Sequence, residues 1–380
     1  MGTNSLCAAS LASWSRPLVP DPRSRRLAAL ADALTAAHVD GLLVTSLPNI
    51  RYLTGFSGSS ALLFVTPRDV VLVTDFRYQT QIVDEVGDLA RVSIEPQSLW
   101  TGLWTQLGQL PYVEVAAFES GHVLHRDFQR LLEGGARWQW RPTVDLVEVL
   151  RERKDAGELA LIEAANGIAT RALHRTLGQI HVGMSELEIA GILEKALRDE
   201  GSEGFPFPSI VASGPRSALP HARSTSRRVA PGDFLLLDFG AETQGYCADV
   251  TRTFVIGRAG TEQREIYDIV RGANETAATR VRAGMSGRDA DAIARDYIQQ
   301  RGYGDLFGHS LGHGLGLEVH EAPRLARTAD GALAEGAVVT IEPGIYRPGW
   351  GGVRIEDDVF LGPGGPHILT SFTRELIELE

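Results

Sequence analysis

A chain of 380 residues is longer than one hydrophobic core usually organises, so the sequence favours two domains. Its 43% hydrophobic and 22% charged residues are typical of a globular enzyme, and no low-complexity run indicates bulk disorder. The 48 acidic and 37 basic side chains give a formal net charge of -11, and because no basic stripe is present we expect no nucleic-acid partner.

The cysteine content and the amino-terminal residues indicate the cellular compartment of the protein. Cys7 and Cys247 are too few and too far apart to form a disulfide framework or a metal finger, which predicts a reducing, cytoplasmic setting. Residues 1–20 hold a short small-residue stretch without a basic flank, which we interpret as a disordered leader. The stretch is too short to span a bilayer, so we expect no membrane partner.

The first part of the chain shows an α/β rhythm. Leu27, Leu30 and Leu34 follow helical spacing, and a strand is expected over residues 41–46. Further strands are predicted over 61–65, 70–74 and 113–118, and helices over 78–86 and 126–132. Residues 21–150 are therefore predicted to form a small α/β domain.

The sequence changes character after a highly charged stretch over residues 151–158, where we place the domain boundary. Helices are expected over 159–177, 185–200, 262–283 and 288–300, together with hairpin-like strand pairs. Residues 151–380 thus predict an α+β domain.

Two segments of the second domain resemble each other. Residues 231–238 and 335–342 each contain a Gly turn, an apolar strand and a terminal acid, Asp238 or Glu342. Each is followed by a Tyr-containing turn and a second strand with another acid, Asp249 or Glu356. This duplication predicts a core with pseudo-two-fold symmetry in which the four acids converge.

Carboxylates that end buried strands are costly to desolvate unless a cation or several donors meet them. Clustered carboxylates also repel one another until positive charge lies between them. A divalent metal meets both requirements, and four acids can bridge two ions. Imidazole ligands are available at His309, His313 and His320, and spacing alone does not choose among them.

Five short motifs carry candidate ligands in order along this domain. They are Leu-Asp-Phe-Gly, Ala-Asp-Val-Thr-Arg-Thr, Gly-His-Gly-Leu-Gly, Ile-Glu-Pro-Gly and Arg-Ile-Glu-Asp, and they contain Asp238, Asp249, His313, Glu342 and Glu356. One such acid alone would usually be a turn former or helix cap, but the ordered set is highly specific. Residues 150–380 resemble the superfamily of creatinase, aminopeptidase P, prolidase and methionine aminopeptidase. The resemblance implies the pita-bread fold, which fits the duplication.

The resemblance also assigns roles to the ligands by position. It implies that Asp238 and Asp249 hold one metal, that His313 and Glu342 hold another, and that Asp249 and Glu356 bridge both. Mn²⁺ is the favoured ion, with Zn²⁺ and Co²⁺ as alternatives. A metal-activated water would attack the peptide bond, and Glu342 would be the proton shuttle.

Four further residues match positions around the metals. His221 and His320 are implied to donate to the substrate carbonyl and to steady the tetrahedral intermediate. Arg354 precedes Glu356 by two residues on one strand face, and we expect it to fix that carboxylate. His309 matches another active-site histidine.

The first domain resembles the creatinase-like amino-terminal domain of Xaa-Pro peptidases through residues 49–58 and 74–78. The leading interpretation is an Xaa-Pro aminopeptidase, which removes an amino-terminal residue that precedes proline. The alternative is an Xaa-Pro dipeptidase (prolidase), which uses the same metals but needs the substrate's free carboxylate. A creatinase-like hydrolase without metal, or a non-catalytic binding relative, would lack the ligands that this chain keeps.

The resemblance implies a homodimer that acts on proline-containing peptides. The sequence leaves open the native metal, the preferred residue before proline, and the preferred substrate length. It also leaves open whether Arg77 and Tyr78 are structural or reach a neighbouring subunit's active site.

Overall fold

The computed structural model describes residues 21–380, so the predicted leader and Cys7 lie outside the described residues. The chain divides into two compact units between Pro142 and Thr143, whereas the charged stretch predicted a boundary between residues 150 and 151. Residues 143–150 thus belong with the second unit, and just after them Arg151 and Lys154 form ion pairs with Glu321 of that unit. No helix within residues 21–380 is long and apolar enough to cross a membrane.

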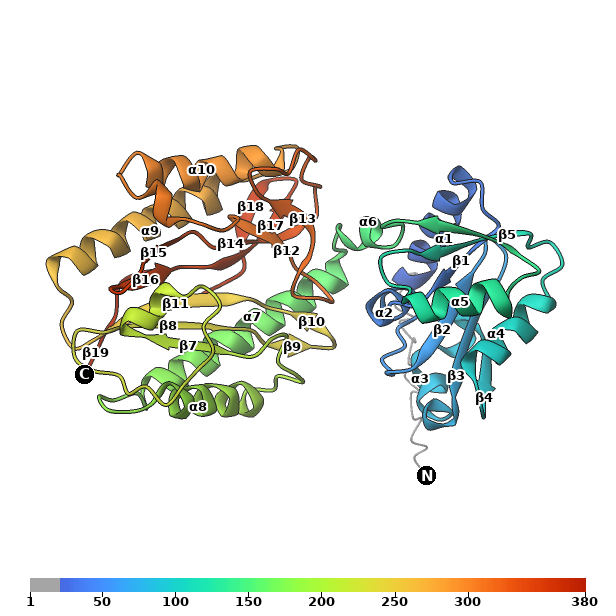
Figure 1. Cartoon of the computed structure of the whole chain (residues 1–380), viewed down its shortest axis with the longest axis horizontal. Coiled ribbons are helices and arrows are strands. Elements are labelled where there is room, and N and C mark those ends of the chain that lie inside the picture. The colour runs from blue at the N-terminus through green and yellow to red at the C-terminus, as the bar shows by residue number, and fades with distance from the viewer. Residues whose placement is uncertain (1–20) are drawn as a thin grey trace, which may run out of the picture. The chain divides into compact units, whose positions relative to one another are not determined.

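The first unit is built on one mixed sheet (Figure 1). Its strand order is β4-β3-β2-β1-β5-β6, with β1 Gly41–Val44, β2 Ala61–Val65, β3 Val70–Asp75, β4 Arg91–Glu95, β5 Val115–Glu119 and β6 Gln139–Thr143. The pairs β1–β2 and β2–β3 are antiparallel, and β1–β5 and β3–β4 are parallel. The helices are α1 Pro22–Ala36, α2 Leu47–Thr54, α3 Gln81–Glu85, α4 Leu99–Gly108 and α5 His125–Glu133. The α/β character expected of this domain is therefore correct.

The predicted helix over residues 78–86 is wrong in extent. A 3₁₀ turn, Phe76–Tyr78, begins there because the Asp75 side chain accepts from the backbone N–H of Arg77. Only the short helix α3 follows, and after it Gly87 has a φ of 56°, a left-handed conformation that does not continue a helix.

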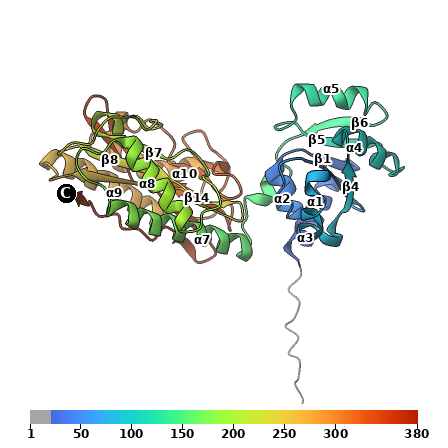
Figure 2. The same cartoon turned by 90° about the horizontal axis from the view of Figure 1, so that it is seen from below.

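The second unit contains two helix pairs and two main sheets (Figures 1 and 2). The first pair is α7 Ala156–Leu177 and α8 Glu186–Asp199, and the second is α9 Thr261–Arg280 and α10 Gly287–Gln299. The short helix α6, Glu148–Arg151, precedes the first pair in the chain. The helix starts follow from the sequence, because Asp155 with Glu158 and Ser185 with Glu188 form capping boxes.

Each helix pair packs on one of the two main sheets. A four-stranded sheet has the order β19-β11-β8-β7, with β7 Ile210–Ser213, β8 Phe234–Phe239, β11 Val250–Ile256 and β19 Glu378–Leu379. Its core residues, including Leu237 and Phe254, cluster with Ala169 of α7 and Leu193 of α8. A five-stranded sheet has the order β13-β12-β14-β17-β18, with β12 Gly312–Gly314, β13 Glu321–Leu325, β14 Val338–Ile341, β17 Asp357–Gly362 and β18 Gly365–Ile368. Its core clusters with α9 and α10.

The duplication predicted from the sequence is confirmed. Strands β8 and β11 pair antiparallel, and the small ribbon of β9 Glu242–Thr243 and β10 Tyr246–Cys247 lies between them in the chain. Strands β14 and β17 also pair antiparallel, with the ribbon of β15 Gly344–Arg347 and β16 Gly351–Arg354 between them. Each hairpin thus carries one acid at the end of its first strand, before the ribbon, and one at the start of its second strand, after the ribbon. This arrangement agrees with the pita-bread fold.

Candidate metal centre

Asp238 lies in β8 and is only 8% exposed. Its Oδ2 accepts a hydrogen bond of 2.5 Å from Arg354 Nη2, which forms a buried ion pair across the two halves of the domain. Asp238 pairs with Thr251 in the register of β8 and β11, so the two side chains share a face of the sheet. The protein itself therefore supplies a cation to this acid.

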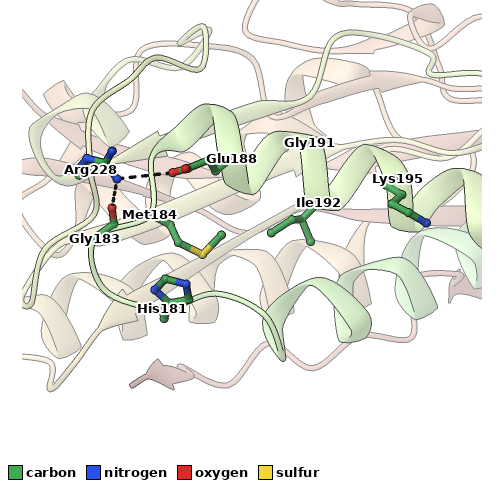
Figure 3. Close-up of a pocket in the computed structure, with 8 residues that line it drawn as sticks. All are labelled: His181, Gly183, Met184, Glu188, Gly191, Ile192, Lys195 and Arg228. Carbon is green, nitrogen blue, oxygen red and sulfur yellow. Dashed lines mark hydrogen bonds and ion pairs between the residues drawn. The ribbon is translucent and has the colours of Figure 1, made fainter.

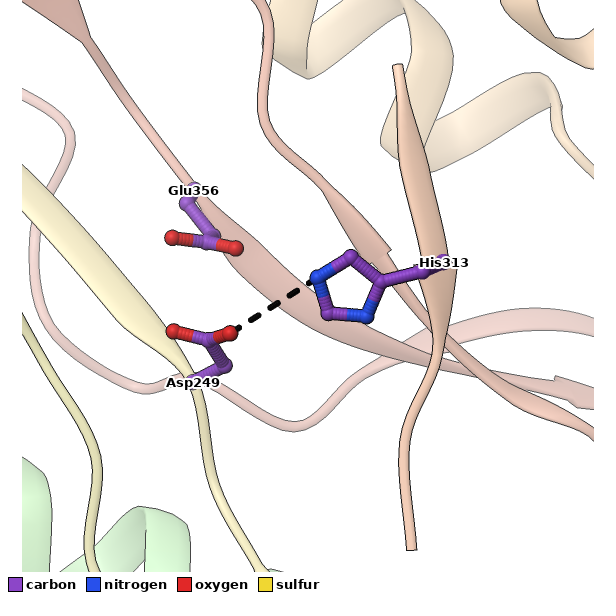
Figure 4. A group of neighbouring side chains, drawn as sticks. All are labelled: Asp249, His313 and Glu356. Carbon is purple, nitrogen blue, oxygen red and sulfur yellow. Dashed lines mark ion pairs between the residues drawn. The ribbon is translucent and has the colours of Figure 1, made fainter. Parts of the chain in front are cut away.

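Asp249, His313 and Glu356 form a second group, which contains no basic side chain other than the imidazole (Figure 4). One ligand atom from each lies within 4.8 Å of the others. Asp249 precedes β11, Glu356 precedes β17, and His313 lies in β12. The Nε2 atom of His313 is 3.8 Å from Asp249 Oδ2, and its Nδ1 pairs with the carbonyl of Gly314 at 3.0 Å. The backbone bond orients the ring so that Nε2 faces the carboxylates.

Glu342 follows β14 and lies beside two imidazoles. Its Oε1 is 3.5 Å from Nε2 of His313, and its Oε2 is 3.9 Å from Nδ1 of His309. The hydroxyl of Thr340 also points to Oε1 at 3.4 Å. All five predicted ligands are thus placed in one region, with Asp238 bound to Arg354 and the other three acids around His313.

The protonation of these groups reflects burial without a compensating cation. Burial raises the pKa of Asp249 well above its ordinary value, and the charge of Glu356 raises it further. Burial likewise raises the pKa of Glu342 to about 8. Burial lowers the pKa of His313 to about 4, so the ring is neutral at pH 7 and its nitrogen is available as a ligand. Without a bound cation, such acids tend to hold protons in place of it.

The chemistry of this donor set fits divalent metal. Oδ1 of Asp238 and Oδ1 of Asp249 are buried and have no hydrogen-bond partner within residues 21–380. Unpartnered buried carboxylate oxygens are unfavourable, and metal coordination would satisfy both. Carboxylates with one imidazole suit Mn²⁺, Co²⁺ and Zn²⁺, and the structure does not choose among them.

Arg354 reaches Glu356, as expected, but it does so through Thr251, a residue that the sequence analysis did not single out. Nε of Arg354 donates to Thr251 Oγ1 at 3.0 Å, and that hydroxyl donates to Glu356 Oε2 at 2.6 Å. Arg354 Nη1 also donates to the hydroxyl of Tyr346 at 2.9 Å, which in turn pairs with His309 Nε2 at 2.8 Å. The alternation of Thr251 and Thr253 along β11 was the available signal, since alternate strand residues share a face.

The remaining predicted histidines are exposed at the edge of this region. The ring of His320 lies 4.3 Å from that of His313, centroid to centroid. His221 follows a 3₁₀ turn, Gly214–Ala218, and its charge acts on Asp238, whose pKa is raised by burial and held down by Arg354 and His221. Both rings are therefore near the acids without being buried among them.

Sequence reasoning also missed Arg324. It lies opposite His313 in the register of β12 and β13, so its side chain leaves the sheet on the same face. It is exposed, and its positive charge contributes to the lowered pKa of His313 and His320, for which burial is the larger cause. Within residues 21–380 its guanidinium has no hydrogen bond or ion pair, in contrast to that of Arg354.

Two surface pockets lie away from the acids. One of about 390 Å³ is lined by residues of α8 and its neighbours, including His181, Met184, Glu188 and Arg228 (Figure 3). The other, of about 360 Å³, is lined by residues around the start of α9. Neither contains a predicted site residue.

Arg77 and Tyr78 make local contacts in the first unit. Arg77 forms a two-pronged ion pair with Asp75 at 2.8 and 2.7 Å, and the Tyr78 hydroxyl pairs with Ser59 Oγ at 2.7 Å. These contacts support a structural role. A role in a neighbouring subunit's active site, and the homodimer itself, stay predictions.

Comparison with known proteins agrees with this geometry. A model of metallopeptidase family M24 matches residues 160–363, and a model of the creatinase/prolidase N-terminal domain matches residues 26–153. The matched segments correspond to the two structural units and include every proposed metal ligand.

Full-length relatives have the same architecture. An Xaa-Pro dipeptidase of Pyrococcus horikoshii is 33% identical over 375 residues, which cover 94% of this chain and 100% of that protein. The structure of an Xaa-Pro dipeptidase from Bacillus anthracis matches with a TM-score of 0.91 at 38% identity, over 94% of this chain and 100% of its own. That of an X-Pro aminopeptidase from Thermotoga maritima matches with a TM-score of 0.86 at 37% identity, over 94% and 100%. The chain therefore belongs to metallopeptidase family M24 and, within it, to the pita-bread Xaa-Pro peptidases with a creatinase/prolidase N-terminal domain.

Proposed function

We propose that this chain is a metal-dependent Xaa-Pro dipeptidase, which hydrolyses dipeptides whose second residue is proline. The leading interpretation from the sequence was the aminopeptidase, and the relatives named above favour the dipeptidase alternative. The observation that carries the proposal is Arg324. A dipeptidase must recognise a free carboxylate beside the scissile bond, and Arg324 is an exposed, unpaired cation on the face of the sheet that His313 shares.

The proposed metal ligands are Asp238, Asp249, His313, Glu342 and Glu356. When bound, two divalent ions would supply the Lewis acidity that activates a water and polarises the scissile carbonyl. Glu342 takes a proton from the attacking water and passes it to the amine nitrogen of the leaving proline as the C–N bond breaks. His320 and His221 donate to the carbonyl oxygen, where negative charge develops. Arg324 binds the proline carboxylate and so sets the register of the dipeptide.

Aminopeptidase activity is the second candidate. Residues 55–59 and 74–78 of the first unit favour it, as does the similarity to the Thermotoga maritima aminopeptidase. An aminopeptidase accepts a chain that continues beyond proline, so a carboxylate at that position is not required. The two candidates therefore differ in whether Arg324 contributes to substrate recognition.

The test compares three substrates with chelator-stripped protein reconstituted with Mn²⁺: Ala-Pro, Ala-Pro amide and Ala-Pro-Ala-Ala. We expect Ala-Pro to be preferred, and Arg324→Met to lower kcat/KM for Ala-Pro by about 10- to 100-fold, the loss expected for a charge-assisted hydrogen bond. Glu342→Gln should abolish all cleavage. The matched control is Arg327→Met, an exposed arginine just beyond β13, which should change little.

Other outcomes would separate the alternatives. Preference for Ala-Pro-Ala-Ala, unaffected by Arg324→Met, would select the aminopeptidase. Cleavage that persists after chelation would overturn the metal mechanism for both.

A further inference from the structure

A buried polar cluster lies directly behind the metal ligand Asp249. The Oδ2 atom of Asp358, in β17, accepts from the backbone N–H of Asp249 at 3.1 Å and from Asn166 Nδ2 at 2.8 Å. The Thr370 hydroxyl donates to Asn166 Oδ1 at 3.0 Å and accepts from the backbone N–H of Asp358 at 3.0 Å. Both the nitrogen and the oxygen of the Asn166 amide, in α7, are therefore hydrogen-bonded. Asn166 orients Asp358, and Asp358 in turn binds the backbone of Asp249.

A second asparagine occupies the related position in the other helix pair. Asn274, in α9, donates from Nδ2 to the carbonyl of Ile341 at 2.9 Å and to the carbonyl of Ile355 at 3.1 Å. These carbonyls belong to the peptide bonds that lead into Glu342 and Glu356. One amide group therefore fixes the backbone in front of two proposed ligands.

The two asparagines stand in matching sequence contexts. Residues 165–169 read Ala-Asn-Gly-Ile-Ala, and residues 273–277 read Ala-Asn-Glu-Thr-Ala. Helices α7 and α9 are the first helices of the two pairs, and each is followed by its partner and its hairpin. The duplication of the strands therefore extends to a helix asparagine behind each hairpin.

Packing alone does not account for these groups. Asn166 is 1% exposed, and Asn274 and Asp358 are fully buried. Asn274 Oδ1 and Asp358 Oδ1 have no hydrogen-bond partner within residues 21–380. Leaving a polar atom buried and unpaired is costly, and an apolar side chain of similar size would avoid that cost. Asp358 does provide a hydrogen bond to the backbone of Asp249, and Asn166 holds Asp358. Asn274 provides hydrogen bonds to the peptide carbonyls that precede two other proposed ligands.

We infer that Asn166, with Asp358, and Asn274 are positioning residues of the metal centre, one in each half of the pseudo-symmetric domain. Asn166 acts through Asp358 on Asp249, and Asn274 acts on the peptide bonds that precede Glu342 and Glu356. The inference rests on the proposed metal centre and goes beyond it, since it concerns how the ligands are held. Groups that orient ligands in this way commonly change metal affinity by about 10- to 100-fold.

The first experiment titrates the chelator-stripped full-length protein with Co²⁺, followed by visible absorption and calorimetry. Asp358→Leu removes the acceptor of the bonds from Asp249 and Asn166 at nearly constant volume, and we expect Co²⁺ affinity to fall about 10- to 100-fold with altered absorption bands. Asp358→Asn is the matched control, because its amide oxygen can take the place of Oδ2 and accept both bonds, while its nitrogen takes the place of Oδ1, which has no partner within the described residues. It should keep Co²⁺ affinity within about fivefold of the original protein.

The second experiment concerns Asn274→Leu, which removes both donors at nearly constant volume. We expect a similar fall in Co²⁺ affinity. The matched control is Tyr267→Phe, also in α9, because it removes partly buried hydrogen bonds to the carbonyls of Arg374 and Glu375, away from the ligands. If Asn274→Leu does not fold, Asn274→Ser retains one donor and should bind Co²⁺ with intermediate affinity.

The outcomes are separable. Co²⁺ affinity within threefold of the original in Asp358→Leu and Asn274→Leu, or an equal loss in Tyr267→Phe or in Asp358→Asn, would each overturn the inference alone. An original protein that binds no Co²⁺ would overturn the metal centre and this inference with it.

Discussion

Two corners of the metal centre bury a carboxylate in opposite ways. In the first, Asp238 meets Arg354 at 2.5 Å, so the protein supplies the positive charge. In the second, Asp249 meets Glu356 and the neutral ring of His313, and burial and then Glu356 raise its pKa well above the ordinary value. The first corner contains a cation of its own, whereas the second contains none. A bound metal ion should therefore affect stability and activity mainly through the Asp249 corner, and the following predictions test this.

The largest effect is expected from Asp249→Asn, which keeps the shape of the side chain and removes its charge. Because Asp249 belongs to the corner without a basic partner, metal binding and with it water activation should be lost. We expect kcat/KM for Ala-Pro to fall by at least about 10³-fold, as for removal of a group needed to activate water. Steady-state kinetics with Mn²⁺ and elemental analysis of the purified protein check both points. A variant with full metal content and activity within tenfold of the original would contradict the comparison.

The next prediction concerns the stability of the metal-free protein, for which the two corners should respond with opposite signs. Arg354→Met leaves Asp238 buried without its partner and should lower the free energy of unfolding by about 3–5 kcal/mol. Asp249→Asn removes a carboxyl whose pKa is raised by burial and by Glu356, and with it the cost of burying and protonating that group, so it should raise the free energy of unfolding by about 1 kcal/mol. Urea denaturation at pH 7 with chelator measures both. Changes of the same sign would show that the corners do not differ in this way.

The sequence predicted the ligands themselves because each acid ends or begins a strand within a specific motif. It did not predict how they are held, since those contacts join segments distant in the chain. Arg354 and Asp238 are 116 residues apart, and Asn166 and Asp358 are 192 apart. The expected fixing of Glu356 by Arg354 takes place through Thr251, a detail that depends on the register of β8 and β11.

The fold could be predicted to the level of domains and duplication, but several elements of the first unit could not. Helix α4 is short, and its two Gly, two Trp and two Thr have low helix propensity, so no helical signal stands out. Strand β4 is mostly half-buried and shows no regular alternation. Helix α2 begins with Leu47-Pro48 and ends at Gly55 in the left-handed region, signals of a turn as much as of a helix.

A third prediction follows from the raised pKa of Glu342, about 8 against an ordinary 4.5. Between these values the folded, metal-free protein keeps a proton that the unfolded chain has released, so stability falls as pH rises. The lowered pKa of His313, about 4 against 6.5, has the opposite effect, but only below pH 6.5. From pH 6.5 to 8 the carboxyl effect therefore remains, and we expect a loss of about 2 kcal/mol at about 1.4 kcal/mol per pH unit.

Urea denaturation with chelator at pH 6.5, 7.2 and 8.0 measures this slope. Glu342→Gln should make it shallower, and saturating Mn²⁺ should remove it, since a bound cation keeps the acids ionised at every pH in the range. If the metal-free protein gains stability over this range, the acids around His313 do not hold protons in the absence of a cation, and the contrast between the two corners is wrong.

The smallest effect is expected from Tyr346→Phe, which acts on the corner that contains its own cation. The hydroxyl accepts from Arg354 and pairs with His309, whose other nitrogen faces the carbonyl of Ser310 and so carries the hydrogen. Loss of the hydroxyl removes one hydrogen bond from Arg354 and one from His309, while the ion pair of Arg354 with Asp238 remains. We therefore expect the free energy of unfolding to fall by about 1 kcal/mol. Since His309 lies near Glu342, kcat/KM of Tyr346→Phe should also fall, by about fivefold. The control Tyr267→Phe should lose a similar amount of stability without a change in kcat/KM. A loss as large as that of Arg354→Met would mean that the ion pair with Asp238 depends on Tyr346, and Arg354 alone would then not account for the stability of the first corner.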